Sequence, residues 1–284
     1  MFRLFICLLV FVGITILLDS CMQFRMSKTE IDTHFNKVHQ HAQQVEYKVG
    51  KRTIHYAKTG NEDAPLVVFV HGSPGSLGDF IQFLSDTSLQ KHAVLISVDR
   101  PGFGQSNFGW AEPSLHEQAK LIKELIEKNK RNQPVILVGH SLGGPVIARI
   151  SMDYPELVDG LVFVAASVDP DLEPARWWRA PFVTPFFRWI FPRSMRASND
   201  EIYPLKPELE EMMDMWKNIR SKTIVIQGTK DSLVPAANAE FIKRQITATE
   251  PIMRYEEGMD HFVPWSHPHL IKNAVLDMLK QVSK

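Results

Sequence analysis

From Val45 onward, the chain alternates short apolar runs with longer segments in which apolar residues recur at helical spacing. Eight of the short runs predict β-strands, at 46–49, 53–59, 66–70, 94–98, 135–138, 161–165, 223–227 and 252–256. The third to the seventh are dense in Val and Ile, which is typical of parallel strands buried on both faces. The first two are separated by Gly50 and Lys51 and predict an N-terminal hairpin.

Five segments between these runs have the periodicity of amphipathic helices, at 77–90, 114–130, 142–154, 236–247 and 268–280. Ser114 and Glu117 form a capping-box pattern at the start of the second. Strands that alternate with helices predict an α/β fold, with a mostly parallel eight-stranded sheet covered by helices on both faces. The core would comprise residues 45–167 and 221–284.

Residues 168–220 interrupt this alternation. The segment is rich in proline and aromatic residues and contains no β-like run. Such a long insertion between two core strands predicts a partly helical cap or lid. Its aromatic side chains are candidates for substrate contacts, chiefly Trp177, Trp178 and Phe187, although most of them could simply form the core of the cap.

The N-terminus has the pattern of an export segment. Arg3 precedes an uncharged apolar stretch at 4–18, whose length suits a signal peptide of residues 1–20 better than a full membrane span. The residues before Cys21 resemble a bacterial lipobox, so we expect lipidation at Cys21 and an exported, membrane-anchored lipoprotein on the periplasmic or cell-surface side. Asp19 departs from the lipobox pattern, which leaves an uncleaved anchor or ordinary secretion open. Residues 21–44 are mainly polar and predict a tether or short helix.

Composition and charge restrict the partners and the metal sites that the chain could have. The 284 residues include 32 Lys and Arg against 32 Asp and Glu, so net charge gives no argument for nucleic acid as a partner. Both cysteines, Cys7 and Cys21, precede the folded body, which therefore has neither a disulfide nor a cysteine metal site. Three histidines in the polar segment could bind a metal, but solvation is the simpler interpretation: His34, His39 and His41.

The strand at 135–138 runs directly into the helix at 142–154, with Ser141 at the corner. Gly139 and Gly143 stand two positions to either side, which is the G-x-S-x-G pattern of a nucleophile elbow. The bend would aim the backbone N–H of Leu142 at the place where a substrate oxyanion forms. A glycine-rich helix cap with a buried serine is the alternative for this motif taken alone.

A serine nucleophile requires a base, and the base requires an acid that orients it. Asp231 follows the strand at 223–227 and His261 follows the strand at 252–256, so both should lie at the edge of the sheet where Ser141 lies. The order Ser, Asp, His fits this arrangement. Alternative acids are Asp169 and Asp171, with Asp260 adjacent to the histidine, and the rival bases are His267 and His269.

A second oxyanion donor is expected in His71-Gly-Ser-Pro-Gly75, where the glycines would let the backbone N–H of Ser73 approach the substrate. An ordinary Gly/Pro turn is the alternative. His71 precedes the nucleophile and is better explained as a residue that organises this loop. Asp99 and Arg100 are predicted to be structural, linking neighbouring loops.

Taken in order, the motifs HGSPG, DRPGFGxS, GHSLGG, GTKDxxVP and DHF resemble the α/β-hydrolase family over the whole body from about Val45. The resemblance implies a triad of Ser141, His261 and Asp231, an oxyanion hole from the N–H groups of Ser73 and Leu142, and a cap. The serine argues against members with aspartate at the elbow. The chain looks most similar to small bacterial esterase-like or peroxidase-like members.

The expected activity is hydrolysis of a small, apolar acyl ester through an acyl-enzyme, with no cofactor and no metal. The same residues could instead serve perhydrolase or haloperoxidase-like chemistry, carbon–carbon bond hydrolysis, or an aminopeptidase. For an aminopeptidase, an acidic residue of the cap would grip the peptide amine, and the candidates are Glu173, Glu208, Glu210 and Glu211. A binding lipoprotein without catalysis is a third hypothesis.

Overall fold

The computed structural model describes residues 2–174, 177–184, 188 and 191–283, with side chains from residue 11 onward. Eight strands form one sheet in the order β1-β2-β4-β3-β5-β6-β7-β8. Strands β3 to β8 are parallel, while β1 pairs with β2 and β2 with β4 in antiparallel fashion. The strands are β1 (Gln43–Val49), β2 (Arg52–Gly60), β3 (Leu66–Val70), β4 (Val94–Val98), β5 (Val135–His140), β6 (Gly160–Val164), β7 (Lys222–Gly228) and β8 (Ile252–Glu256).

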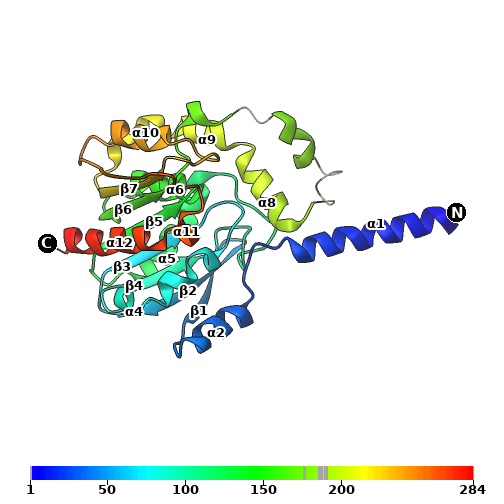
Figure 1. Ribbon diagram of the computed structural model, residues 1–284, viewed down its shortest axis with the longest axis horizontal. Coiled ribbons are helices and arrows are strands. Elements are labelled where there is room, and N and C mark those ends of the chain that lie inside the picture. The colour runs from blue at the N-terminus through cyan, green and yellow to red at the C-terminus, as the bar shows by residue number, and fades with distance from the viewer. Residues whose placement is uncertain (1, 175–176, 185–187, 189–190, 284) are drawn as a thin grey trace.

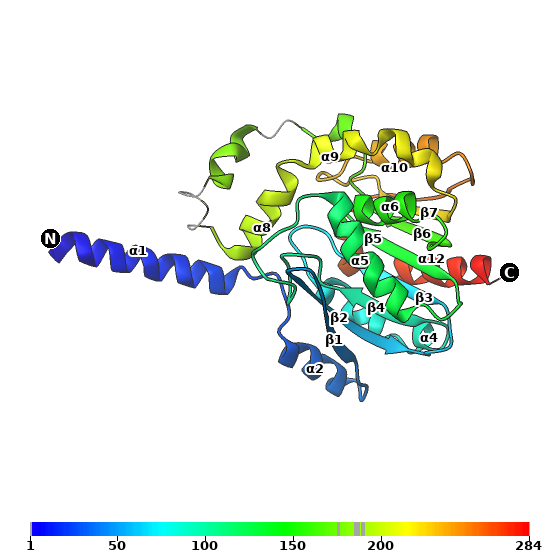
Figure 2. The same cartoon turned by 180° about the vertical axis from the view of Figure 1, so that it is seen from behind.

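Helices cover both faces of the sheet, as the two opposite views show (Figures 1 and 2). Side chains alternate along β3, so Val68 packs with one helical layer and Phe69 with the other. The first layer holds α5 (Leu115–Asn129), α6 (Gly143–Asp153) and α10 (Ala237–Gln245). The second holds α3 (Ile81–Leu84), α4 (Thr87–Gln90) and α12 (Pro268–Val282). The structure thus confirms the predicted α/β architecture and its N-terminal hairpin.

One predicted helix is wrong. The segment 77–90 forms three short pieces, namely the 3₁₀ turn η1 (Leu77–Phe80), α3 and α4. Asp86 explains the break before α4, since its carboxylate accepts the backbone N–H groups of Ser88 and Leu89 and so begins a new helix. The apolar spacing across the segment is real, because Phe80, Leu84 and Leu89 are all buried.

The described part of the 168–220 insertion is helical and contains no strand. It comprises η2 (Pro170–Leu172), η3 (Trp177–Val183), α8 (Arg193–Ile202), α9 (Leu205–Glu211) and η4 (Met213–Asn218). Leu205, Leu209 and Trp216 are buried in the same cluster as α6, which seats the second half of the insertion on the sheet layers. In Figure 1, α8 and η3 lie beyond the end of the sheet.

The N-terminal residues form two helices of different character. Helix α1 (Phe2–Cys21) projects away from the body (Figure 1), and Cys21 at its end is a free, exposed thiol. Helix α2 (Lys28–Lys37) begins at a capping box made by Ser27 and Glu30 and buries Ile31 against the core. Among the residues that the structure describes, no helix is long and apolar enough to cross a membrane.

Near the C-terminus, a short helical turn, α11 (Val263–Ser266), precedes α12.

Candidate active site

Ser141 occupies a sharp turn between β5 and α6. Its backbone has φ +53°, a left-handed conformation that costs a residue with a side chain roughly 1–2 kcal/mol. The turn is closely packed: a Cβ added at Gly139 would lie 2.5 Å from the Gly143 oxygen, and one at Gly143 would lie 2.2 Å from the Val70 oxygen. The backbone N–H of Ser141 donates to the oxygen of Val164 at 2.9 Å. The glycines at these positions therefore let the turn form, and neighbouring backbone holds it.

Two backbone donors are available beside Ser141. The N–H groups of Ser73 and Leu142 make no hydrogen bond to any other residue that the structure describes. A Cβ added at Gly72 would lie 2.9 Å from the Cβ of Ser141, so the loop that carries Ser73 runs directly against the turn. Both residues line the same cavity as Ser141. Donors in such positions can stabilise an oxyanion.

Asp231 and His261 come together at the ends of β7 and β8. Asp231 Oδ2 lies 2.7 Å from His261 Nδ1, and Asp231 Oδ1 accepts the backbone N–H groups of Leu233 at 2.9 Å and Val234 at 2.8 Å. Because Nδ1 faces the carboxylate, Nε2 is the imidazole nitrogen available to the cavity. His261 and Ser141 both line that cavity. The pair can accept a proton from a hydroxyl group bound there.

The carboxylate of Asp231 is the charged partner of this pair. Burial acts to raise its pKa, but the hydrogen bonds from His261 and from the Val234 and Leu233 N–H groups outweigh burial, so its pKa lies below the ordinary value. An ionised carboxylate at Nδ1 keeps the imidazole in one tautomer and stabilises it when protonated.

The alternative acids and bases are engaged elsewhere. Asp169 caps η2 by accepting the backbone N–H of Asp171 at 2.9 Å. Asp260 accepts the backbone N–H of Phe262 at 2.9 Å. His267 contacts the hydroxyl of Ser266, and His269 is exposed on α12. His34 lies near the hydroxyl of Ser85, and among the described residues no three metal-ligating side chains cluster.

The sequence interpretation missed His140. Its Nε2 donates to the backbone oxygen of His261 at 2.9 Å, and burial lowers its pKa to about 3, with the nearby His261 adding to the effect. His140 is therefore a neutral donor that ties the loop of His261 to the turn of Ser141. It occupies the variable position of G-x-S-x-G, so the pattern gave no signal for it.

Arg100 is the buried link between the Ser73 loop and the insertion. Its Nε donates to the oxygen of His71 and its Nη2 to that of Gly72, both at 2.8 Å. The same guanidinium pairs with Glu201 of α8 through two contacts of 2.7 and 2.9 Å. His71 in turn accepts the backbone N–H of Arg100 at its Nε2 and donates from Nδ1 to Gly72. This confirms that His71 and Arg100 organise loops, and Glu201 adds a tie to the insertion that the sequence did not reveal.

A cavity of about 820 Å³ opens at Ser141. One wall comes from the insertion, with Met195, Ile202 and Leu205, and another from the loops after β7 and β8, with Leu233 and Trp265. A third wall was not predicted. It is formed by Phe24, Arg25 and Met26, which belong to the segment that we expected to be a tether or short helix.

Neither Trp177 nor Trp178 is among the described residues that line the cavity at Ser141. Trp177 is 80% exposed. Trp178 lines a smaller cavity of about 420 Å³, next to Pro74 and Met195. Phe187 lies outside the described residues. Trp216 is core, where it packs edge-on against Phe241.

Asp79 of η1 contributes a carboxyl group to the cavity wall. Burial raises its pKa to about 7, and the Asp99 carboxylate adds to the effect, whereas the Ser76 N–H and the Arg100 guanidinium oppose it. A raised folded-state pKa means that the folded protein holds this proton more tightly than the unfolded chain. The group therefore costs stability as the pH rises from about 4 to about 7, and the full cost remains above that range.

We expect Asp79→Asn to stabilise the protein by about 2 kcal/mol at pH 8 and to leave stability unchanged near pH 4, since each unit of pKa is worth about 1.4 kcal/mol and cavity water reduces the cost. Urea unfolding at the two pH values measures this. Asp171→Asn, at an exposed carboxylate, is the control and should have no pH-dependent effect. Equal stability of Asp79→Asn and wild type at pH 8 would contradict the expectation.

The chain is similar to known proteins, and these similarities identify its family. The family model described as "Alpha/beta hydrolase family" matches residues 67–274. The dihydrolipoyllysine-residue acetyltransferase component of the acetoin cleaving system of Cupriavidus necator is 30% identical over 225 residues, which cover 66% of this chain and 57% of that protein. The chain thus spans little more than half the length of this curated relative.

Solved structures extend the likeness to the fold of the whole chain. A putative lipase from Acinetobacter baumannii superposes with a TM-score of 0.68 at 18% identity, covering 91% of this chain and 97% of that one. A membrane phospholipase A superposes with a TM-score of 0.67 at 15% identity, covering all of both chains. With the matched family model spanning most of the core, the chain belongs to the α/β-hydrolase family.

Proposed function

We propose that the protein is a serine hydrolase that cleaves carboxylic esters through an acyl-enzyme at Ser141. The observation that carries the proposal is the 2.7 Å contact between Asp231 Oδ2 and His261 Nδ1, in a cavity that also contains Ser141 in its strained turn. A strained nucleophile, an oriented base and free backbone donors are the groups that acyl transfer requires.

In the proposed reaction, Ser141 Oγ attacks the ester carbonyl carbon while its proton passes to His261 Nε2. The carbonyl oxygen becomes an oxyanion and accepts hydrogen bonds from the N–H groups of Ser73 and Leu142. Collapse expels the alcohol, which takes the proton from His261. Water, deprotonated by His261, then attacks the acyl-enzyme, and collapse releases the acid while Ser141 Oγ takes the proton back from His261. Asp231 keeps the imidazole oriented and stabilises its charge throughout.

We infer that residues 168–220 serve as the cap over this site and favour an apolar acyl group. Met195, Ile202 and Leu205 line the cavity from this segment, while Leu233, Phe262 and Trp265 line it from the core loops. Two of the structural relatives, a putative lipase and a phospholipase A, bear the names of enzymes that act on acyl esters, which supports the same substrate class.

A chain-length series of p-nitrophenyl esters, set against the matching amides, tests the proposal. We expect turnover of the esters to exceed that of the amides at least a hundredfold, and a fluorophosphonate probe to label the tryptic peptide that contains Ser141. Folded protein that neither turns over any ester nor reacts with the probe would refute it.

An aminopeptidase remains a second candidate because of Glu173. Of the four glutamates considered for the cap, only Glu173 is among the described residues that line the cavity, where its carboxylate accepts the hydroxyl of Ser167. Glu208 instead accepts the backbone N–H of Leu115, and Glu211 pairs with Arg149. Aminoacyl p-nitroanilides added to the same series separate the candidates, since an aminopeptidase would prefer a free α-amine over its acetylated form.

A further inference from the structure

The N-terminal segment is built into the active-site cavity. We propose that helix α1 is retained in the mature enzyme and inserts into a lipid bilayer, so that the cavity takes ester-linked acyl chains from that surface. The proposal rests on the ester hydrolysis proposed above for the choice of substrate, but the fate of α1 can be tested without it.

The first support is the way in which the end of α1 is bound to the cap. Pro192, the residue before α8, supplies no side-chain cap, and Asp19 takes that role from a distant part of the chain. Asp19 Oδ1 accepts the backbone N–H of Arg193 at 2.7 Å, and Oδ2 accepts its Nε and Nη2 at 2.9 and 2.8 Å. Next to these contacts between Asp19 and Arg193, the backbone oxygen of Met22 accepts a hydrogen bond from the hydroxyl of Ser194.

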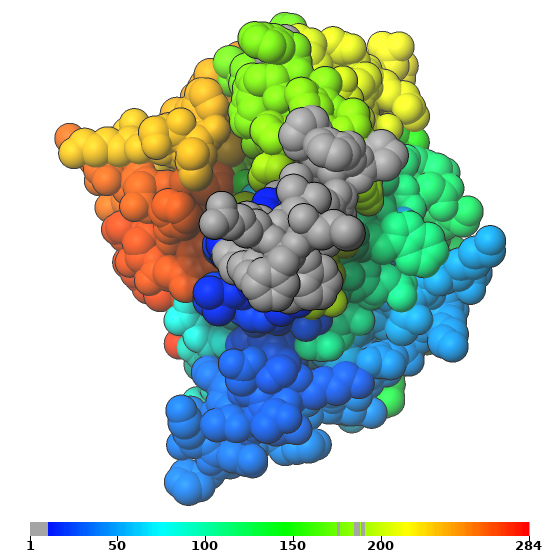
Figure 3. Space-filling view, turned by 90° about the vertical axis from the view of Figure 1, so that its right-hand side faces the viewer, coloured from blue at the N-terminus to red at the C-terminus, as the bar shows by residue number. Residues whose placement is uncertain are grey.

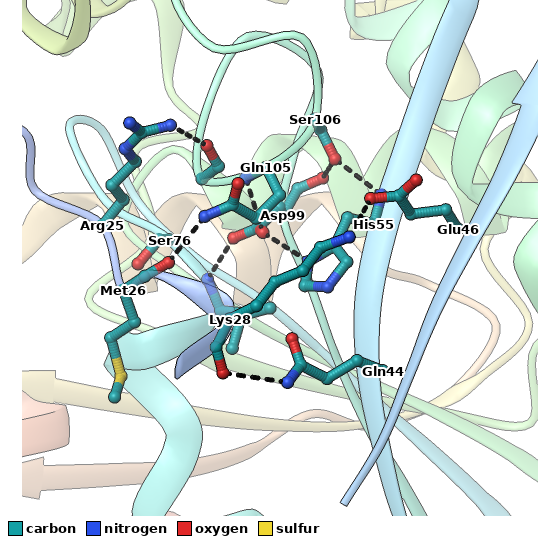
Figure 4. Close-up of polar contacts among 12 residues, drawn as sticks. Arg25, Met26, Lys28, Gln44, Glu46, His55, Ser76, Asp99, Gln105 and Ser106 are labelled. Carbon is teal, nitrogen blue, oxygen red and sulfur yellow. Dashed lines mark hydrogen bonds and ion pairs between the residues drawn. The ribbon is translucent and has the colours of Figure 1, made fainter. Parts of the chain in front are cut away.

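The same segment is bound to the core a few residues later. Arg25 donates to the backbone oxygen of Gly104 at 3.1 Å, and Gln105 donates to the backbone oxygen of Met26 at 2.9 Å (Figure 4). Gln105 is itself held by Asp99, which accepts its backbone N–H at 2.9 Å. Residues 19–26 thus bridge the cap and the core, and Phe24, Arg25 and Met26 form a wall of the cavity between the two attachments.

These contacts conflict with cleavage before Cys21. Cleavage there would remove Asp19, leaving the backbone N–H of Arg193 at the start of α8 without its acceptor and the Arg193 guanidinium without its carboxylate. Asp19 is also the residue that departs from the lipobox pattern. Retention of α1 and lipidation of Cys21 after cleavage therefore exclude one another, and the bonded role of Asp19 favours retention.

The second support is the surface of α1. Residues 4–18 carry no charge, and at about 1.5 Å per residue this stretch is about 22 Å long, which reaches well past the middle of a bilayer core about 30 Å thick. Among its described side chains, Ile16 and Leu17 are 62% and 63% exposed. An apolar helix that projects from the body in this way needs an apolar environment, and lipid provides one.

Charge at the base of α1 points to lipid rather than to an apolar protein partner. The guanidinium groups of Arg25 and Arg193 stack on the Phe108 ring at 4.0 and 4.8 Å, and Arg188 and Arg196 lie beside them on the cap. Of these four, Arg193 is paired with Asp19 and Arg188 with Asp200. Arg25 also lies near the carboxylates of Glu30 and Asp99, which leaves Arg196 without a carboxylate partner of its own among the described residues. Its positive charge near the end of an uncharged helix complements anionic headgroups.

Geometry then places the cavity at the lipid surface. Phe24 in the cavity wall follows Cys21, the last residue of α1, by three positions, a span of at most about 11 Å. Figure 3 looks onto this end of the molecule, where blue N-terminal residues lie below the green cap and beside the orange C-terminal part. An acyl chain would need to move only this short distance to reach the cavity.

The test uses the full chain expressed in a bacterial host and vesicles of phosphatidylcholine with one quarter phosphatidylglycerol. We expect the intact mass to include residues 1–20, wild type to float with the vesicles, and binding to weaken at least tenfold in 0.5 M salt or without phosphatidylglycerol. A mature chain that begins at Cys21 would overturn the proposal, and so would flotation that changes with neither salt nor anionic lipid.

The variant Ile16→Asn/Leu17→Asn tests the link to substrate. We expect hydrolysis of vesicle phospholipid to fall at least tenfold while hydrolysis of a soluble butyrate ester stays within twofold of wild type. Val38→Asn, at a similarly exposed apolar residue after α2, is the control and should change neither. Unchanged vesicle hydrolysis in the double variant would refute the proposal. Wild type that floats but hydrolyses neither substrate would instead refute the ester hydrolase function.

Discussion

Ser141→Ala should reduce kcat for ester hydrolysis by at least about 10⁴-fold, because the covalent route through an acyl-enzyme is lost and only binding and the oxyanion donors remain. Fluorophosphonate labelling should disappear with it. The measurement is steady-state hydrolysis of the best ester in the chain-length series. A variant that kept more than a tenth of wild-type kcat would remove Ser141 from the mechanism.

The turn at Ser141 supplies the control for folding. Its φ of +53° suits glycine, so Ser141→Gly should be equally inactive yet no less stable than wild type. Relief of roughly 1–2 kcal/mol of backbone strain would offset the greater freedom of glycine in the unfolded chain, which is about 0.4–1 kcal/mol. Thermal unfolding of both variants separates loss of chemistry from loss of structure. Such strain at a nucleophile is stability given up for function.

The sheet and its active edge could be predicted because their causes are local. Val and Ile runs such as 135–138 must be buried on both faces, and Gly139 and Gly143 are needed wherever a strand turns this sharply into a helix. Parallel strands then place the residues after each carboxyl end at one edge, which is why Asp231 and His261 could be paired from chain order alone.

Helix boundaries within a periodic segment were harder to predict from the sequence. The segment 77–90 has helical spacing, yet Asp86 caps a new helix instead of continuing the old one. An aspartate in the interior of a pattern can either face solvent or bond to the backbone, and the pattern does not distinguish the two.

Contacts between distant segments carried no sequence signal. Asp19 and Arg193 are 174 positions apart, and Arg100 and Glu201 are 101 apart, so neither ion pair follows from spacing. Aromatic richness was also ambiguous in the insertion, where Trp216 became core while Trp177 stayed exposed. Burial of each aromatic depends on where the insertion folds back, which is a tertiary property.

The two ion pairs between distant segments attach the insertion to the walls of the candidate active site. Glu201 ties α8 to the loop of Ser73 through Arg100, and Arg193 ties its other end to the N-terminal segment through Asp19. Both ends of one helix are thus fixed to walls of the cavity. A shift of α8 would therefore move the loop of Ser73 and the cavity wall together.

Asp231→Asn should lower kcat by about 10⁴-fold with folding intact, since the amide cannot stabilise a protonated imidazole. Its NH₂ group would also donate to Nδ1 of His261 and so favour the tautomer in which Nε2 carries the proton and cannot act as the base. The backbone N–H groups of Leu233 and Val234 can still be accepted by the amide oxygen, so the loop should keep its shape. Asp169→Asn and Asp171→Asn are matched controls, because neither carboxylate contacts His261, and each should stay within threefold of wild type. Steady-state kinetics of the three variants decide the assignment: if Asp169→Asn or Asp171→Asn lost activity and Asp231→Asn did not, the acid would be misassigned. A large loss at Asp231 alone would show that the short contact to His261 is needed for proton transfer and not only for holding two loops together.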